Sequence, residues 1–289
     1  MAEITAQLVK ELREMTGAGM MECKKALTEA EGEMEKAVDV LRTRGLAAAA
    51  KKADRATNEG LVVALLSDDA KAGALAKVNC ETDFVSRNEV FGGYAAKVVK
   101  AVLDNDPASI DALKASTIDG VTVEALITDA IHTIGENIQI SSFVRRSVST
   151  GALATYIHGG GRIGVLVEFS FANAATAAHD QFKALAKDIA MQIAAANPGA
   201  VSRDDFSAEV VAHEVEIYKA QAAESGKPEN IQEKMAQGRL EKFYKESALV
   251  EQAFIKDPDT TVRAHIENVS KAVGDTIAVK GFDRFALGQ

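Results

Sequence analysis

Hydrophobic residues recur every three to four positions in three short stretches at the start of the chain, which is the spacing of amphipathic helices. The first of these faces is formed by Ile4, Leu8, Leu12 and Met15. Residues 16–19, Thr-Gly-Ala-Gly, are expected to break this helix, and a second helix runs from Met20 to about Ala30. Gly32 then separates it from a third helix that Gly45 is expected to end. The pattern predicts a compact three-helix unit, followed by an Ala- and Lys-rich helical connector over residues 46–54.

An alternating apolar pattern follows and predicts a β-hairpin, with strands over residues 60–66 and 74–78. In the second strand, Ala74, Ala76 and Val78 are expected to share one better-buried face. The alternation stops at residues 79–85, Asn-Cys-Glu-Thr-Asp-Phe-Val. Residues 86–89 fit a capping box, with Val85 and Val90 placed as a hydrophobic staple, so a helix is predicted to begin there. Phe84 is then left on the strand-to-helix turn.

Phe84 has two interpretations. An aromatic side chain at a turn usually folds back into the core. Phe84 nevertheless stands outside the strand alternation and outside the staple, so its ring is not needed to fix the turn and its apolar area is useful against another surface. Met20 and Met21 also have two interpretations. They are ordinary core residues, or they form a soft apolar contact surface, because Met repacks easily against partners.

A weak internal repeat organises the rest of the chain. Residues 135–145 match residues 274–284 at Gly, acid, Ile, β-branched, Phe and Arg positions. Each repeat follows a hairpin and a long amphipathic helix, and the second hairpin comprises residues 153–157 and 163–171. We therefore predict an α+β fold, in which the core has two related halves, each a small antiparallel sheet with helices on one face.

The second half is expected to carry an inserted helical hairpin. Its first helix steps by four, three and four residues through Val211, Val215, Tyr218 and Ala222. Residues 225–228, Ser-Gly-Lys-Pro, end it, and the returning helix carries Ile231, Met235, Leu240 and Phe243. The pattern predicts an antiparallel coiled-coil arm of roughly 25 Å, at 1.5 Å per residue. Its many charges favour projection toward a partner, although a solvated helix face has the same pattern.

Composition narrows the function classes. The chain has 289 residues, of which 47% are hydrophobic and 26% charged, as expected of a globular protein with several ordinary cores. A net charge of -9 argues against a general nucleic-acid binder, because phosphate contacts need a surplus of Lys and Arg. The two cysteines, Cys23 and Cys80, give neither a disulfide framework nor a metal site. With no apolar run of membrane-spanning length, no membrane partner is expected and a cytoplasmic location is predicted.

The motifs of common enzymes are incomplete. Gly159, Gly161 and Gly164 have the spacing of a dinucleotide loop, but a strand follows where that loop needs a helix. Residues 158–161, His-Gly-Gly-Gly, resemble an esterase oxyanion loop, yet the sequence holds no Gly-x-Ser-x-Gly nucleophile and no P-loop. We therefore expect no catalytic residue, no metal and no cofactor. His158 lies at a hairpin tip, where contact with a partner and stabilisation of the turn are equally good explanations.

Three segments together resemble the elongation factor Ts family. They are residues 16–27, Thr-Gly-Ala-Gly-Met-Met-Glu-Cys-Lys-Lys-Ala-Leu, residues 79–85, Asn-Cys-Glu-Thr-Asp-Phe-Val, and the segment from Tyr156 to Val167. The resemblance covers nearly the whole chain. It implies a ubiquitin-associated-like helical domain at the N-terminus, a two-part core, and a coiled-coil arm. It also implies a translation factor that is not an enzyme and that exchanges guanine nucleotides on the GTPase elongation factor Tu, bound in its GDP and nucleotide-free states.

The same resemblance implies which residues act. Thr82, Asp83, Phe84 and Val85 would displace the magnesium ion of the GTPase, with Phe84 wedging between two of its helices. Further partner contacts would come from Leu12, Met20, Met21, His158 and Gly159. The loop after His158 is one residue longer than in some relatives, which affects the reach of that histidine. The sequence stops at Gln289, so the helical C-terminal contact of some members is expected to be missing.

The expected domains are residues 1–55, which anchor the partner, residues 56–145, which carry the Thr-Asp-Phe motif, and residues 146–289, with the hairpin inserted at about 202–244. Other functions stay open on this basis. One alternative is a partner-binding scaffold or chaperone without exchange activity, and another is an enzyme with its site at His158. A homodimer through the core or the arm is a further alternative to a monomer.

Overall fold

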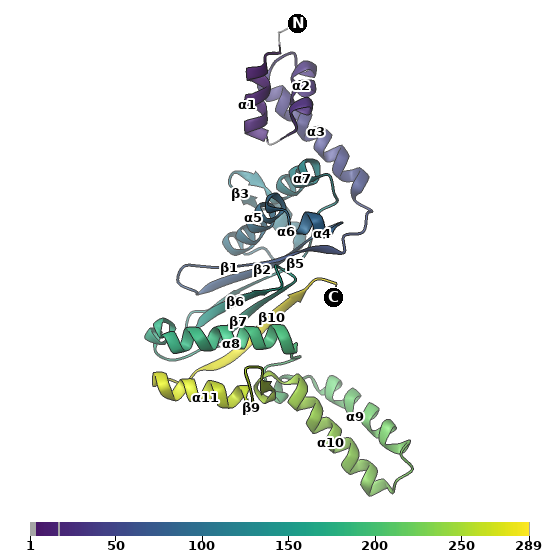
Figure 1. Cartoon of the computed structure of the whole chain (residues 1–289), viewed down its shortest axis with the longest axis vertical. Helices are drawn as coiled ribbons and strands as arrows, with labels where there is room; N and C mark the ends of the chain where they lie inside the picture. Colours follow the sequence, from purple (N-terminus) through teal and green to yellow (C-terminus); the bar gives the residue numbers. More distant parts are fainter. Residues whose placement is uncertain (1–3, 17, 289) are drawn as a thin grey trace.

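The computed structural model describes residues 4–16 and 18–288, and over these it is an α+β structure with small antiparallel sheets. The molecule is elongated, with three N-terminal helices at one end, two three-stranded sheets in the middle, and a helical hairpin projecting at the other end (Figure 1). None of the described helices combines the length and the apolar character that crossing a bilayer requires.

The N-terminal helices are α1 (Ala6–Thr16), α2 (Met20–Glu29) and α3 (Met34–Lys52). They enclose a small cluster of their own, in which Leu12, Cys23 and Leu27 are fully buried. Gly32 adopts a left-handed conformation, φ 87°, in the turn between α2 and α3. Of the predicted break at residues 16–19, Gly17 lies outside the described residues, whereas Thr16 ends α1 and Gly19 precedes α2. The three predicted helices are thus present.

The predicted end of the third helix at Gly45 is wrong. Helix α3 continues through this residue to Lys52 and passes alongside α7 (Val123–Ile134). A Cβ atom at position 45 would lie 3.4 Å from the Thr128 methyl carbon of α7. Gly45 therefore permits two helices to approach each other and does not terminate one of them. The expected connector is the second half of the same helix, and Ala49 packs against the adjoining core.

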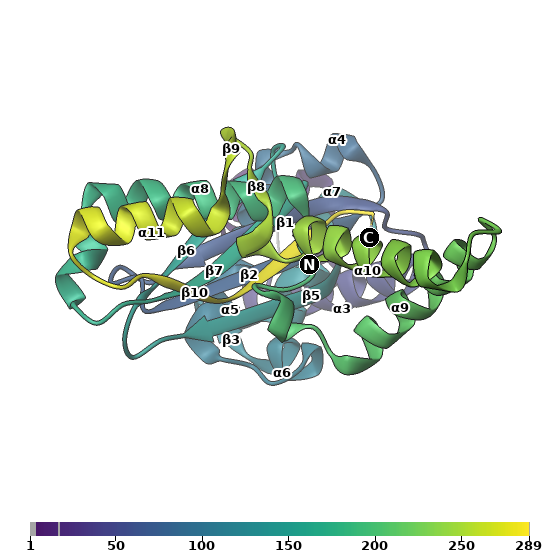
Figure 2. The same cartoon turned by 90° about the horizontal axis from the view of Figure 1, so that it is seen from below.

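The middle of the molecule has four layers. One sheet has the order β1 (Glu59–Leu66), β2 (Ala72–Cys80), β5 (Gln139–Ser147), and α5 (Glu89–Asn105) and α7 cover its outer face. The other has the order β10 (Ala278–Ala286), β7 (Ile163–Ser170), β6 (Ala152–His158), covered by α8 (Asp180–Ala196) and α11 (Val262–Val273). Figure 2 shows α8 and α11 in front of the strands. The bare faces of the two sheets pack against each other through Leu75, Leu153 and Leu166.

This layering corrects the expectation for the second strand. Ala74, Ala76 and Val78 of β2 do share a buried face, which contacts the helices α5 and α7. Leu75, on the opposite face, is just as fully buried because it packs against the second sheet. A central strand between a helix layer and another sheet is apolar on both faces, so its alternation is weak in the sequence.

The two repeated segments adopt the same local structure. Gly135 ends α7 and Gly274 ends α11, both in the left-handed conformation, with φ of 89° and 71°. The strands that follow, β5 and β10, each pair with the middle strand of their sheet and each contain one bulge. The bulges fall at Ser141 and Lys280, which occupy the same position of the repeat. The two segments that match in sequence thus also have a β-bulge at the same position.

Several short elements follow from no pattern that the sequence displayed. They are α6 (Ile110–Ala115), β3 (Thr117–Ile118), β4 (Val121–Thr122), β8 (Ala253–Phe254), β9 (Asp257–Thr261) and the 3-10 turns η1 (Ala174–Ala178), η2 (Arg203–Asp205) and η3 (Leu249–Glu251). Each has six residues or fewer, which is too short for a hydrophobic period to distinguish it from a loop.

The helical hairpin consists of α9 (Ala208–Ala223) and α10 (Glu229–Ser247). Its ends are tied together, because Ala200 and Ala248 form a parallel bridge next to Leu249, which belongs to the core between α8, α11 and their sheet. At this base, Arg203 lies 2.7 Å from Glu251 and 3.1 Å from Glu241 and stacks on the ring of Tyr244. Hydrogen bonds from Arg203 lower the pKa of the Glu251 carboxyl group. The hairpin is held at its base and extends away from the sheets (Figure 1).

Replacement of residues 202–244 by a short Gly/Ser loop should leave a cooperative thermal transition. The bridge between Ala200 and Ala248 remains in that variant, as does the fully buried Leu249. Leu249→Ala in the full chain is the matched control, with an expected loss of about 2–5 kcal/mol of unfolding free energy. Differential scanning calorimetry measures both. A broad, non-cooperative transition in the loop variant would show that the hairpin contributes core surface.

Leu12→Ala should destabilise the N-terminal helices much more than Met21→Ala. Leu12 is fully buried, so its truncation is expected to cost about 2–5 kcal/mol of unfolding free energy. Met21 has 65% of its surface exposed, so the same change there should cost less than about 0.5 kcal/mol. Hydrogen exchange of the amides in α1 and α2 reports the difference locally. Equal protection in the two variants would contradict the packing described here.

Candidate functional site

The Thr-Asp-Phe motif forms a helical turn of its own, α4 (Asp83–Ser86). Thr82 is its N-cap, with the side-chain oxygen accepting a hydrogen bond from the Val85 amide at 3.4 Å. The next helix, α5, has a separate N-cap, Asn88, whose side chain accepts from the Val90 amide at 2.8 Å. The predicted capping box starting at Ser86 is therefore wrong. Two capping residues six positions apart leave room for one extra turn of helix, and Phe84 lies on that turn.

Because α5 is capped at Asn88, Val85 and Val90 do not occupy the two positions of a hydrophobic staple, so that prediction is also wrong. Val85 packs against the first core, whereas Val90 has 51% of its surface exposed. Phe84 has 84% of its surface exposed, so the usual outcome for an aromatic at a turn does not apply to it. The aromatic that fills the core here is Phe91, which is fully buried on α5. The fold therefore has no use for the Phe84 ring.

The segment before α4 is fixed by hydrogen bonds with the loop between α7 and β5. The Glu136 carboxylate accepts from the backbone amides of Glu81 and Thr82, at 2.9 and 3.1 Å. It also accepts from the Thr82 hydroxyl at 2.6 Å. In return, the Glu81 carboxylate accepts from the Asn137 amide at 2.6 Å, which lowers the pKa of Glu81. These four hydrogen bonds hold the start of α4 in place. They do so without help from Phe84, whose ring packs little against the rest of the chain.

Two neighbouring groups complete this region. Asp83 accepts a hydrogen bond at 2.9 Å from the guanidinium of Arg87, the residue that follows α4, so its carboxylate is paired and stays partly exposed. Cys80, the last residue of β2, is buried, and its thiol contacts the Thr82 carbonyl oxygen at 3.2 Å. Burial, together with the charge of Glu136, raises the pKa of the Cys80 thiol to about 12. The thiol is therefore protonated at neutral pH and unreactive.

The loop at residues 158–162 lies at the same end of the sheets as α4. In β1, Glu59 pairs with Cys80 directly before the motif, and the Arg162 side chain of the loop lies 3.9 Å from the Glu59 carboxylate. His158 is exposed, and its Nδ1 atom lies 3.1 Å from the Tyr156 hydroxyl. Gly159 is also exposed, with φ of 60°. The sheets thus bring two predicted contact segments to one side of the molecule.

This glycine loop is anchored at its far end. The Gly161 carbonyl oxygen accepts a hydrogen bond from the Val62 amide of β1 at 2.7 Å. A Cβ atom at Gly161 would overlap the Leu61 side chain. Gly161 has φ of 95°, a conformation that favours glycine, and lies against β1, whereas His158 and Gly159 form the exposed side of the loop.

The predicted contact residues of the N-terminal unit divide into two kinds. Met20 and Met21 have 58% and 65% of their surface exposed, so they are not core residues. Leu12 is fully buried among the three helices and cannot contact a partner directly, which corrects its assignment as a binding residue. Residues four apart on α1 share a face, and the face of Leu12 is the one that packs inward. These residues are on the helical unit, at the opposite end from the hairpin (Figure 1).

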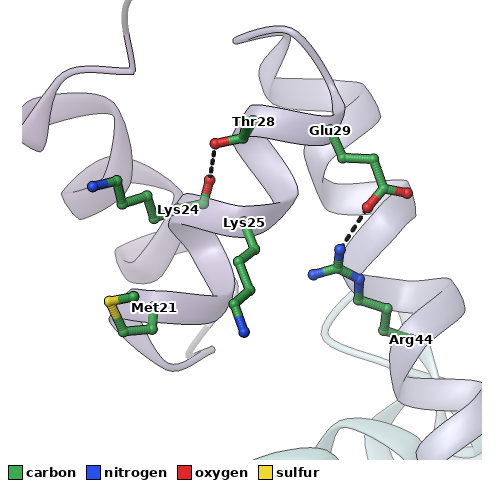
Figure 3. A pocket seen from close by; sticks show the side chains of 6 residues that line it. All are labelled: Met21, Lys24, Lys25, Thr28, Glu29 and Arg44. Carbon is green, nitrogen blue, oxygen red and sulfur yellow. Dashed lines mark hydrogen bonds and ion pairs between the residues drawn. The ribbon is translucent and has the colours of Figure 1, made fainter.

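Met21 borders a shallow pocket on α2 and α3 (Figure 3). The other lining residues are Lys24, Lys25, Thr28, Glu29 and Arg44. Arg44 of α3 pairs with Glu29 of α2, whereas Lys24 and Lys25 extend from α2 toward solvent in this view. An exposed apolar side chain beside two cationic groups is a surface suited to another protein, with no enclosed space for a small molecule.

A larger groove of about 960 Å³ lies beside the contact between α3 and α7 and is lined by residues of α1, α3, α5 and α7. Its apolar lining includes the exposed side chains of Met15, Leu46, Val90 and Val121. Beside it, the Nε2 atom of His132 on α7 lies 2.5 Å from the Glu22 carboxylate of α2. Within residues 4–16 and 18–288, no group of three His, Cys, Asp or Glu side chains has the arrangement of a metal site.

The contribution of Glu136 is a feature that the sequence analysis missed. The signal was present, because Glu136 and Asp275 occupy the acidic position of the internal repeat. Asp275 plays the equivalent part in the second half: it accepts from the amides of Ala172 and Asn173 and from the Thr176 hydroxyl. These hydrogen bonds, that of Thr176 foremost, lower the pKa of Asp275 to about 2.

Comparisons with known proteins identify relatives along nearly the whole chain. The family model described as elongation factor TS matches residues 81–289. The elongation factor Ts of Clostridioides difficile (strain 630) is 50% identical over 291 residues, which cover 100% of this chain and 94% of the relative. That of Clostridium perfringens (strain SM101 / Type A) is 49% identical over 287 residues, covering 99% and 93%. That of Nitratidesulfovibrio vulgaris (strain DP4) is 50% identical over 287 residues, covering 99% and 96%.

The family match includes α4, the glycine loop and the hairpin, and the relatives align along both the N-terminal helices and the core. Identity near one half over the full length leaves no large segment unaccounted for. The chain therefore belongs to the elongation factor Ts family and is a translation elongation factor.

Proposed function

We propose that this chain binds elongation factor Tu, displaces its magnesium ion and promotes the release of GDP and its exchange for GTP. The observation that carries the proposal is the 84% exposure of Phe84 on a short helix whose start is fixed by four hydrogen bonds. A large apolar side chain that is exposed and yet firmly placed loses little entropy when a partner covers it.

The proposal assigns each contact surface to one part of the chain. Residues 1–55 form a ubiquitin-associated-like domain that anchors the partner through Met20 and Met21. Residues 56–145 form the half of the core that carries Thr82, Asp83, Phe84 and Val85. Residues 146–289 form a related half, which adds His158 and Gly159 and carries the coiled-coil arm at about 202–244. The matching bulges at Ser141 and Lys280 support the relation between the halves.

The proposed mechanism needs no proton transfer. A GTPase holds its nucleotide through Mg²⁺ and a cradle of backbone N–H groups, and the ion is the largest positive charge on the phosphates. Phe84, inserted between helices that position the ion, would move these helices apart and weaken the binding of the nucleotide. Because coupling between two ligands is reciprocal, returning nucleotide releases the factor from its partner. The factor thus accelerates exchange in both directions without shifting the equilibrium between the GDP-bound and GTP-bound partner.

Phe84→Ala should abolish most of the exchange activity and leave the fold intact. An exposed side chain costs less than about 0.5 kcal/mol of stability when truncated, whereas a central contact residue can cost about 2 kcal/mol or more of binding. Release of fluorescent GDP from elongation factor Tu measures activity, and thermal unfolding measures stability. Phe91→Ala is the matched control, because Phe91 is fully buried and its truncation should cost about 3–5 kcal/mol of stability.

Asp83→Ala extends this test. Asp83 and Phe84 lie on the same turn, so the double variant is expected to lose less activity than the sum of the two single losses. Unimpaired exchange by folded Phe84→Ala would refute the wedge. Binding of elongation factor Tu with no acceleration of GDP release by the unaltered chain would favour the scaffold alternative.

Substitution of both Met20 and Met21 by Ala should weaken binding of elongation factor Tu and leave the maximal rate of GDP release near that of the unaltered chain. Both side chains are exposed on α2, at a distance from α4 along the elongated molecule (Figure 1). The expected loss of affinity is about tenfold, or about 1.4 kcal/mol. Leu46→Ala is the control, since Leu46 is an exposed apolar residue of α3, with 52% of its surface accessible. Equal affinities for the double variant and the control would remove the anchoring role from α2.

A further inference from the structure

We infer that Glu136 is a positioning residue for the exchange reaction, which it serves by holding Phe84 in place without touching the partner. This inference rests on the proposed function. Phe84 is 84% exposed, so core packing does not fix its position. Its position depends on where α4 begins and on the orientation of that single turn. Both are set by the residues directly before it, Glu81 and Thr82.

Glu136 uses both carboxylate oxygens on this segment. Its Oε2 atom accepts from the Glu81 and Thr82 amides, and its Oε1 atom accepts from the Thr82 hydroxyl. The Thr82 oxygen in turn accepts from the Val85 amide and caps α4. A hydroxyl that donates to Glu136 has its lone pairs directed toward the helix. One side chain thus fixes the backbone before α4 and the rotamer of its cap.

Glu136 is itself held by well-packed elements. It follows Gly135, the left-handed end of α7, and β5 begins three residues later at Gln139. Between them, Asn137 and Ile138 are both 2% exposed. The Asn137 side chain donates to the Ala53 and Arg55 carbonyl oxygens, just beyond the end of α3. The carboxylate therefore projects from a rigid corner that also secures the chain leaving α3.

The second half of the chain contains the same arrangement of hydrogen bonds, but the turn that follows it carries no proposed contact residue. Asp275 binds two amides and the Thr176 hydroxyl after β7, as Glu136 does after β2. The turn that follows there, η1, has the sequence Ala-Ala-Thr-Ala-Ala and presents no large side chain. Asp275 therefore has a structural role only. The repeat supplies an internal control that separates loss of stability from loss of positioning.

The test compares Glu136→Ala, Glu136→Gln and Asp275→Ala in the full chain. Glu136→Ala should lower the maximal rate of GDP release at saturating factor by about tenfold or more, because fewer complexes have Phe84 in the productive orientation. Affinity for elongation factor Tu should fall no further than in Phe84→Ala, since the surfaces on α2 and the glycine loop are untouched. Glu136→Gln retains one acceptor oxygen and should recover part of the rate. Asp275→Ala should lower the melting temperature and keep the rate of the unaltered chain.

Hydrogen exchange of the Glu81, Thr82 and Val85 amides gives a readout that is independent of the partner. These amides should exchange at least about tenfold faster in Glu136→Ala, and their rates should be unchanged in Asp275→Ala. The inference is overturned if Glu136→Ala keeps the maximal exchange rate, or if Asp275→Ala reduces it equally. If the unaltered chain does not accelerate GDP release, the proposed function fails, and the amide rates alone decide whether Glu136 positions α4: faster exchange supports it and unchanged exchange refutes it.

Discussion

The face-to-face contact between the two sheets is the constraint on which the rest of the structure depends. Leu75, Leu153 and Leu166 are buried between the sheets, so each sheet has helices on one face and the other sheet on its second face. Gly73 permits the close approach, because a Cβ atom there would lie 2.9 Å from Leu166. Arg146 of β5 adds ion pairs to Asp283 and Glu168 across the two sheets. Every projecting part of the molecule, from α4 to the hairpin, is oriented by this common platform.

Much of the fold could be predicted because long periodic segments determine their own structure. Helices α1, α2 and α5, both central hairpins and the two helices of the arm follow from apolar spacing and turn residues. The end of α3 could not be predicted from the sequence. A glycine such as Gly45 can end a helix or can permit a neighbouring helix to approach, and the sequence does not distinguish the two. Likewise, Leu12 and Met21 are both apolar residues on amphipathic helices, and only the packing distinguishes the buried one from the exposed one.

The candidate site was predictable in location and less so in detail. The loss of alternation after Val78 indicated the segment, and the family resemblance indicated the residues. Both Thr82 and Asn88 act as caps, so the chain forms the additional turn α4 before α5, and the hydrogen bonds that Glu136 accepts hold the Thr82 cap in place. Glu136 is separated from Thr82 by more than fifty residues, so its contribution depends on the pairing of β5 with β2. Hydrophobic periodicity does not indicate such a contact. The acidic residue that recurs in the internal repeat, as Glu136 and Asp275, does indicate it.

The continuity of α3 has a consequence for recognition. A single helix of 19 residues, about 28 Å long at 1.5 Å per residue, extends from the three-helix cluster to the edge of the first core. The proposed function places one contact surface on α2 and another on α4. A flexible tether in place of α3 would let these two surfaces adapt to partners of many shapes. A continuous helix instead acts as a ruler, so that only a protein whose complementary surfaces have the matching separation and angle can engage both at once. Selectivity is then a matter of spacing as much as of chemistry.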